Sequence, residues 1–206
     1  MTKLKIQTGS DNPILRLRSK EVVAVGGSAK LAATGLSFGG FVKGMKKTLV
    51  EQKGLGLAAP QVGENVRVIL CRMDAGSDHE VLFVMVNPEI VEMSASAEEL
   101  AVVNKEVKAG KFKKDRGDDS APFGIEVGEE GCLSLPGQYI DVVRAVSIVV
   151  RFKDGRGFLK GGTRGGGSRA KKASDLGDVE LGLHGMNARV VQHEVDHLNG
   201  VLICDK

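Results

Sequence analysis

The chain has 206 residues, of which 42% are hydrophobic and 27% are charged, and its formal net charge is +3 at pH 7. This length and composition suit a single globular domain whose core needs no disulfide scaffold, and the three scattered cysteines could not build one. No apolar run of about 18 residues is present, so we expect no membrane span, and so small a net charge gives no reason of its own to expect binding to DNA.

The N-terminal part of the chain predicts an arm followed by a helix. Residues 11–25 favour an extended arm with one short apolar turn. Within residues 38–49 the apolar side chains recur at spacings of four and three, which is the period of an amphipathic helix. Gly54 follows at a position where a left-handed residue commonly ends a helix, so we expect the helix to stop there.

The next part predicts strands and a long insertion. Residues 66–73 and 81–86 are rich in β-branched side chains and predict two strands, the second ended by Asn87 and Pro88. A short helix could open the following stretch, but most of that stretch is charged and poor in large apolar residues. We therefore expect a surface insertion at about 94–128.

The C-terminal part predicts strands, a second insertion and a final helix. Residues 139–152 alternate well enough for one long strand or for two with a bend, and Asp154–Gly155 is a hairpin-turn signal. Residues 155–182 are rich in glycine and basic residues, so a flexible surface insertion is the simplest interpretation. A contact between this insertion and ribosomal RNA is the alternative. Residues 186–202 predict the helix.

The sequence His193-Glu194-Val195-Asp196-His197 is the strongest chemical signal in the chain. Two histidines at positions i and i+4 of a helix point the same way, so both imidazoles can bind one metal ion. Glu194 follows the first histidine, where its carboxylate can take a proton from the attacking water. The alternative is a surface helix with two incidental histidines.

A metal site with two histidines needs a third protein ligand and an open position. The other histidines, the acidic residues and the cysteines are candidates; His79 lies in a polar segment and His184 lies beside a glycine. Cys132 follows a glycine and precedes Leu-Ser-Leu-Pro, a context that packing alone explains poorly. For Cys71 and Cys204 we expect buried, inert thiols.

Residues 54–63 (GLGLAAPQVG) are mostly small. A dinucleotide site would need a strand before this segment and a helix after it, whereas a predicted helix precedes it and Pro60 lies within it, so we reject that interpretation. Small side chains let another backbone lie close, which favours a peptide-binding edge. Gln61 would place an amide donor at its rim, where it can stabilise an oxyanion.

Taken in chain order, residues 54–63, 130–134 (EGCLS) and 192–200 (QHEVDHLNG) resemble the three signature motifs of the peptide deformylase family. Residues 12–16 (NPILR) also resemble the amino-terminal arm of that family. The resemblance implies an α+β fold in which antiparallel β-sheets surround a central helix that carries the HExxH motif. We accordingly expect residues 1–206 to form a single catalytic domain with the two surface insertions described above.

The resemblance implies a metal-dependent hydrolase that removes the N-formyl group from the N-terminal methionine of newly made polypeptides and releases formate. Its metal ligands would be Cys132, His193 and His197. They would hold one divalent metal ion per chain, natively Fe²⁺ and often Zn²⁺, Ni²⁺ or Co²⁺ in its place. Glu194 would be the general acid and base.

The same resemblance implies the groups that bind the substrate. The oxyanion donors would be Gln61 and the backbone N–H of Leu133. Arg189 stands where the family often has an aliphatic residue, so we expect its charge at the mouth of the methionine pocket. A salt bridge on a strand face is the simpler interpretation of Arg144. The residues implied to bind the substrate are Leu55, Gly56, Gly131, Arg144 and Val190.

The implied partners are N-formylated nascent peptides and, through the basic insertion, the ribosome surface; neither DNA nor a membrane is expected. The expected location is a compartment with bacterial-type translation. The two insertions favour a eukaryotic organelle, the mitochondrion, over the bacterial cytoplasm.

Two other functions stay open at this point. A zinc metallopeptidase of the HExxH type would cleave internal peptide bonds, but such sites commonly take a glutamate or histidine as third ligand. A deformylase-like protein that only binds peptides is the other, and the intact Cys132 and Glu194 argue against it. Release of formate distinguishes deformylation from both.

Overall fold

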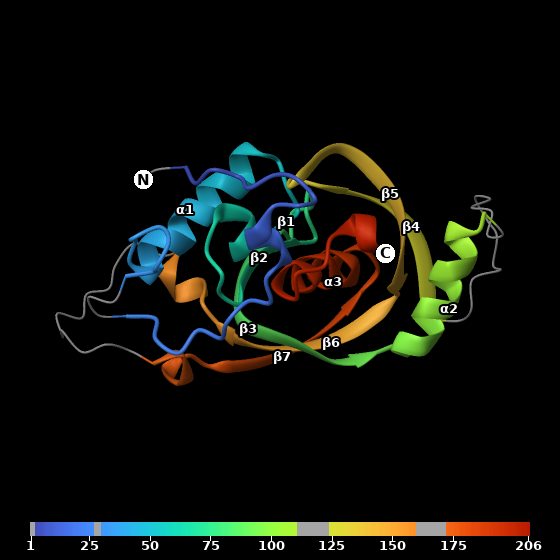
Figure 1. Ribbon diagram of the computed structural model, residues 1–206. Coiled ribbons are helices and arrows are strands. Elements are labelled where there is room, and N and C mark those ends of the chain that lie inside the picture. Colours follow the sequence, from blue (N-terminus) through green and yellow to red (C-terminus); the bar gives the residue numbers. More distant parts are fainter. Residues whose placement is uncertain (1–2, 27–29, 111–123, 160–171) are drawn as a thin grey trace.

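The computed structural model describes residues 3–26, 30–110, 124–159 and 172–206 and shows a mixed α+β fold (Figure 1). The helices in this part of the chain are α1 (Phe38–Glu51), α2 (Ala97–Lys108) and α3 (Gly185–Leu198). The strands are β1 (Gly56–Ala58), β2 (Val68–Met73), β3 (Val81–Met93), β4 (Ile125–Cys132), β5 (Leu135–Ala145), β6 (Ser147–Asp154) and β7 (Asp178–His184). The α+β class predicted from the sequence is confirmed.

The strands form two antiparallel sheets. One sheet has the order β1-β2-β3-β6-β7, and β4 and β5 form a separate hairpin. Helix α3 lies between them and contacts strands of both (Figure 1). Its apolar residues, among them Val191 and Leu198, pack against the larger sheet. Its polar residues Arg189, Gln192 and His193 instead bond to β4 and β5.

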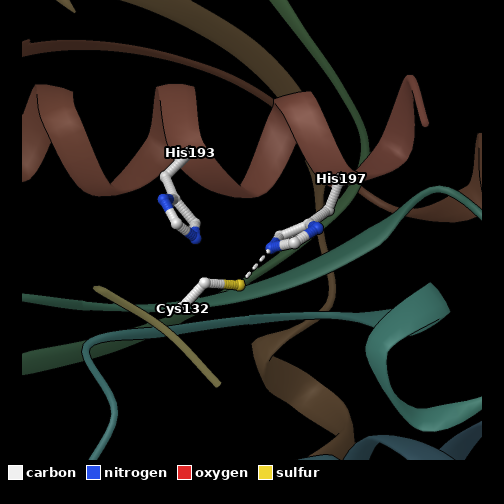
Figure 2. Close-up of side chains that lie close together, drawn as sticks. All are labelled: Cys132, His193 and His197. Carbon is white, nitrogen blue, oxygen red and sulfur yellow. Dashed lines mark hydrogen bonds between the residues drawn. The ribbon is translucent and has the colours of Figure 1, made fainter. Parts of the chain in front are cut away.

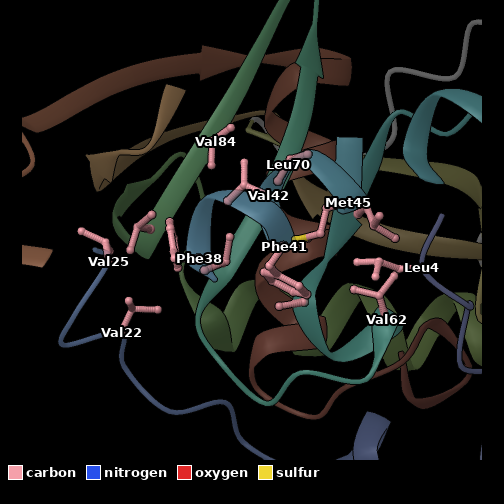
Figure 3. Packing of buried hydrophobic residues seen from close by; sticks show 14 of the residues in the cluster. Leu4, Val22, Val25, Phe38, Phe41, Val42, Met45, Val62, Leu70 and Val84 are labelled. Carbon is pink, nitrogen blue, oxygen red and sulfur yellow. The ribbon is translucent and has the colours of Figure 1, made fainter. Parts of the chain in front are cut away.

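Helix α1 closes the other side of the larger sheet (Figure 3). The hydroxyl of Ser37 accepts a hydrogen bond from the backbone N–H of Gly40 at 3.2 Å and so caps the first turn. The predicted apolar stripe is buried, and Phe41 and Met45 have no exposed surface. The amphipathic period read from residues 38–49 therefore describes the buried face correctly.

The end of α1 differs from the prediction. The left-handed residue after the helix is Lys53, with φ 53°, and not Gly54. Gly54 has a different requirement, because a Cβ there would lie 2.9 Å from Cδ1 of Leu49. The glycine is thus needed for close packing rather than for its dihedral angles.

Strand β3 also differs from the prediction, because it continues through Asn87 and Pro88 to Met93. The β3–β6 register shifts between Val86 and Glu89, so a bulge accommodates the proline, which has no N–H to donate. Asn87 has φ 52°, and its side chain accepts from Val22 N at 2.8 Å and donates to Val22 O at 3.0 Å. A partner 65 residues away therefore stabilises a position that locally resembles a strand end.

In the second half of the chain the two-strand alternative is confirmed, with β5 and β6 separated at Val146. Asp154–Gly155 does not form the expected hairpin turn; the Asp154 carboxylate accepts from Arg156 N and begins a short 3₁₀ helix, Arg156–Phe158. Strands β4 and β7 include residues 125–128 and 178–182, which fall within the ranges predicted to be insertions. The remainder of both expected insertions includes residues 111–123 and 160–171, which lie outside the described residues.

The final helix is shorter than predicted and ends at Leu198. Two residues later, Gly200 has φ 76°, and a Cβ there would lie 2.5 Å from the carbonyl oxygen of Arg16. The left-handed Gly200 ends the helix, with its N–H donating to His197 O at 3.2 Å and Val201 N–H donating to Asp196 O at 3.0 Å, and its missing side chain leaves room for the N-terminal arm. Within the described ranges, every helix is too short or too polar to cross a bilayer.

The buried face of α1 predicts a stability difference between two positions on the same helix. We expect Phe41→Ala to lower the free energy of unfolding by about 3–5 kcal/mol, because Phe41 is fully buried. Val50→Ala, at a side chain that is 56% exposed, should change it by less than about 0.5 kcal/mol. Urea denaturation of both variants at one metal concentration measures the difference, and equal losses would contradict the packing described here.

Candidate metal centre and substrate cleft

Three of the predicted site residues meet at the end of β4 and on one face of α3. The ligand atoms of Cys132, His193 and His197 all lie within 4.8 Å of one another, and Cys132 Sγ lies 3.2 Å from His197 Nε2. Both rings project from α3 toward the sulfur (Figure 2). One thiolate and two imidazoles are a donor set that suits a divalent transition metal. The residues present therefore fit the metal that the sequence pattern predicts.

Cys132 is the last residue of β4, and the local structure explains why its side chain faces the helix. Gly131 pairs with Tyr139, but Cys132 pairs with Leu135, so the β4–β5 register shifts between them. Burial still alternates at this end of β4, with Glu130 and Cys132 buried and Gly131 exposed, so the sulfur shares the inward face of Glu130. The two histidines share a face because they stand at the i and i+4 positions of a helix.

Glu130 orients the first histidine. Its Oε2 lies 2.8 Å from His193 Nδ1, which leaves the Nε2 of that ring for a metal ion. The guanidinium of Arg144 donates to both carboxylate oxygens of Glu130, each at 2.9 Å. Burial alone would raise the pKa of Glu130, but hydrogen bonds from Arg144 and His193 hold that pKa well below its usual range.

Arg144 and Arg189 differ from what the resemblance implied. Arg144 is 3% exposed, binds Glu130 and Asp196, and is absent from the residues that line the cleft, which agrees with the salt-bridge interpretation and not with the substrate contact that the resemblance implied. Arg189 is 4% exposed, and its charge lies against Glu130 rather than at the pocket mouth. Only Arg189 was expected beside the substrate without an alternative, and both arginines are bound to buried acceptors.

Glu194 lies beside the ligands and against β1. A Cβ on Gly56 would lie 2.3 Å from Glu194 Oε1, so only glycine leaves room for this carboxylate. Burial raises the pKa of Glu194 to about 7. Its Oε2 is buried and has no hydrogen-bond partner among the described residues. An unsatisfied buried oxygen at this place is available to a water or to a substrate amine.

Gln61 points its amide nitrogen toward the sulfur of Cys132. Its Oε1 accepts a hydrogen bond from Ala58 N at 2.8 Å. Because an N–H can donate only to the amide oxygen, this bond distinguishes the oxygen from the nitrogen of the Gln61 amide. Its Nε2 then lies 3.6 Å from Cys132 Sγ and 3.3 Å from Ser134 Oγ. The donor end of a buried amide therefore faces the site, as the sequence predicted.

A cleft of about 430 Å³ opens beside these groups. The predicted substrate residues other than Arg144 line it, and so does Leu133. Several lining residues were not predicted, among them the exposed rim residues Tyr139, which is 69% exposed, and Met186, which is 60% exposed. Sequence patterns gave no signal for them. The lining residues predicted from the sequence are Leu55, Gly56, Gln61, Gly131, Cys132, Leu133, Arg189, Val190, His193 and Glu194.

Glu130 is the functional residue that the sequence interpretation missed, although a signal was present. It lies two positions before Cys132, and alternate residues of a strand share a face. An acidic residue on the same face as a predicted metal ligand is a candidate partner for a ligating histidine.

The other histidines and cysteines lie apart from the metal group. His79 and His184 are exposed, and neither belongs to the cluster of ligand atoms. Cys71 is buried as expected, and burial raises its pKa well above the usual value. Cys204 is exposed, which corrects the expectation that it is buried.

Comparisons with known proteins agree with one another. A family model described as Polypeptide deformylase matches residues 4–160 and 172–206. A peptide deformylase from Prochlorococcus marinus is 32% identical over 198 residues, covering 96% of this chain and 74% of that protein. The peptide deformylase structure from Thermotoga maritima has a TM-score of 0.67 and 28% identity, covering 100% of this chain and 98% of that one. A class I type b peptide deformylase from Acinetobacter baumannii, solved with Met-Ala-Ser bound, has a TM-score of 0.63 and 28% identity, covering 99% and 98%.

The hydrogen bond between Glu130 and His193 predicts that a substitution at Glu130 weakens metal binding although all three proposed ligands remain. We expect Glu130→Gln to weaken metal binding roughly 10–100-fold, because a partner that orients a ligating histidine contributes about that much. Glu129→Gln, an exposed neighbour on the same strand, is the control. Competition with a chromogenic chelator measures both affinities, and an unchanged affinity in Glu130→Gln would contradict the role given to this carboxylate.

Proposed function

The chain belongs to the peptide deformylase family, and from this premise we propose which residues hold its metal ion and carry out its reaction. It is a metal-dependent hydrolase that removes formyl groups from nascent polypeptides. The observation that carries the assignment of residues is the convergence of one sulfur and two imidazoles beside a buried carboxylate. Neither the metallopeptidase nor the binding-only alternative has an observation that favours it.

Cys132, His193 and His197 would hold one divalent metal ion. When bound, such an ion polarises a carbonyl and lowers the pKa of a water molecule that it coordinates. We propose Fe²⁺ as the native metal, with Zn²⁺, Ni²⁺ or Co²⁺ able to replace it. The mixed thiolate and imidazole donors support a divalent transition metal, and the choice of Fe²⁺ among these ions rests on the family resemblance. Metal analysis of protein purified without oxygen distinguishes the four.

Glu194 would move the proton. Its carboxylate accepts a proton from the attacking water and passes it to the departing amine, so that the formyl amide is converted to formate and a free amino terminus. Its buried Oε2, which has no partner among the described residues, supports this role. Gly56 matters because it leaves room for the carboxylate.

The negative charge that develops on the formyl oxygen would be stabilised by the Gln61 amide and by the backbone N–H of Leu133. Gln61 is 1% exposed and its amide is held by Ala58, so it needs little reorganisation during the reaction. A donor fixed before the charge develops stabilises the transition state more than a mobile one.

The substrate would lie extended along the cleft, beside Leu55, Gly56 and Gly131. Leu133 and Val190 would contact its methionine side chain. The Acinetobacter baumannii relative was solved with the peptide Met-Ala-Ser bound, which supports a peptide beginning with methionine as the ligand of this cleft. Arg144 is left out of this set because it does not line the cleft.

Three wider expectations are kept as proposals. We propose that residues 1–206 form a single catalytic domain. Contact with the ribosome surface would use the basic segment, much of which lies outside the described residues. The relatives named above are bacterial, consistent with a compartment that has bacterial-type translation; the mitochondrial location stays a prediction.

The role of Glu194 predicts a variant that binds metal but does not turn over. We expect Glu194→Gln to keep about one metal ion per chain and to lose formate release by roughly 10²–10⁴-fold, the usual contribution of a general base. Glu98→Gln, an exposed position on α2, makes the same change of charge away from the site. Formate release from a formyl-methionyl peptide and metal content are measured together. Full activity in Glu194→Gln would overturn the proton-transfer role.

The role of Cys132 predicts a variant that loses its metal ion, in contrast to Glu194→Gln, which should keep it. We expect Cys132→Ser to lose metal during dialysis against a chelator that leaves the unsubstituted protein loaded, because serine is a poor replacement for a thiolate ligand. Cys204→Ser, at an exposed thiol outside the cluster, should keep its metal. Retention of metal by Cys132→Ser at full occupancy would remove this residue from the ligand set.

A further inference from the structure

Arg189 lies on α3 one turn before His193 and is 4% exposed. It borders the cleft, yet its guanidinium is directed away from it into the β4–β5 hairpin. Burying a cation costs several kcal/mol unless its donors are satisfied. The acceptors bound by this guanidinium are Glu130 Oε1 at 2.8 Å and the carbonyl oxygens of Val142 at 3.1 Å, Glu126 at 3.2 Å and Gly128 at 3.3 Å.

The two oxygens of the Glu130 carboxylate have different sets of partners. Oε1 accepts from Arg189 at 2.8 Å and from Arg144 at 2.9 Å. Oε2 accepts from Arg144 at 2.9 Å and faces His193 Nδ1 at 2.8 Å. Arg144 alone would let the carboxylate tilt about the axis of the ion pair. A second guanidinium, attached to a different element, leaves it one orientation, with Oε2 toward His193.

The guanidinium of Arg189 fills space on β4 where Gly128 has no side chain. A Cβ on Gly128 would lie 2.8 Å from Arg189 Cζ and 2.9 Å from one of its terminal nitrogens. Any other residue at this position would push the guanidinium from its acceptors. The missing side chain of Gly128 and the long side chain of Arg189 therefore fit each other, independently of the hydrogen bonds.

We propose that Arg189 is a positioning residue for the metal ligand His193, acting through Glu130, while its aliphatic stem forms part of the cleft wall. The role rests on the metal site proposed above. The two parts of the Arg189 side chain therefore have different roles: the guanidinium acts on the metal site through Glu130, and the aliphatic stem lines the substrate cleft.

The surrounding charges make this role testable. If the guanidinium of Arg189 is removed, Glu130 still pairs with Arg144, so no buried carboxylate is left without a cation. Arg144 in turn keeps its ion pairs with Glu130 and Asp196. Methionine at position 189 would retain an apolar stem of similar length. Arg189→Met should therefore fold and keep the cleft wall.

The experiment compares Arg189→Met and Gly128→Ala with the unsubstituted protein, and Arg151→Met serves as the matched control at an exposed arginine paired with Glu180. The dissociation constant for Zn²⁺ is measured by chelator competition, with kcat and KM for a formyl-methionyl peptide measured at saturating Zn²⁺. We expect the first two variants to bind Zn²⁺ roughly 10–100-fold more weakly. We expect the control to be unchanged, and KM of Arg189→Met to stay within about twofold because the stem remains.

An arginine with a merely structural role would lower the melting temperature of the metal-free protein and leave the Zn²⁺ affinity of the folded protein unchanged. That result in Arg189→Met overturns the proposal, as does an equal loss of affinity in Arg151→Met. If Arg189→Met does not fold, Gly128→Ala decides, because it displaces the guanidinium without removing it. Absence of formate release by the unsubstituted protein would instead count against the proposed function, and the Zn²⁺ comparison would still decide the role of Arg189.

Discussion

The buried carboxylate of Glu130 is the constraint on which the arrangement of the site depends. It is 6% exposed and joins three elements, because its partners Arg144, Arg189 and His193 come from β5 and α3 while it belongs to β4. A buried anion with fewer partners would be strongly destabilising. The hairpin and the helix are therefore held in the one relative position that satisfies it, and in that position Cys132 faces both histidine rings.

The two sides of α3 have different roles. One side packs Val191 and Leu198 into the apolar core against the larger sheet. The other side carries Arg189, His193 and His197, which bind polar groups of the hairpin. Burial of the apolar side stabilises the helix, and this allows the polar side to hold charged groups in a precise geometry at little further entropic cost.

The sequence predicted those features that depend on short-range patterns. The helical period gave the buried face of α1, and the spacing of His193 and His197 placed two imidazoles on one helix face. It failed where a distant partner decides the conformation. Asn87 and Pro88 resemble a strand end, but Val22 stabilises the bulge that lets β3 continue. Arg189 was placed at the pocket mouth, and the salt bridge expected for Arg144 had no assigned partner, because nothing local identifies Glu130 as their acceptor.

The central claim is that one sulfur and two imidazole nitrogens bind a single metal ion, and X-ray absorption at the metal K-edge tests it most directly. For the Zn²⁺-loaded protein the account predicts one sulfur at about 2.3 Å and two imidazole nitrogens at about 2.0–2.1 Å. The sulfur contribution should disappear in Cys132→Ser. A spectrum of the unsubstituted, loaded protein that shows only nitrogen and oxygen neighbours would contradict the account.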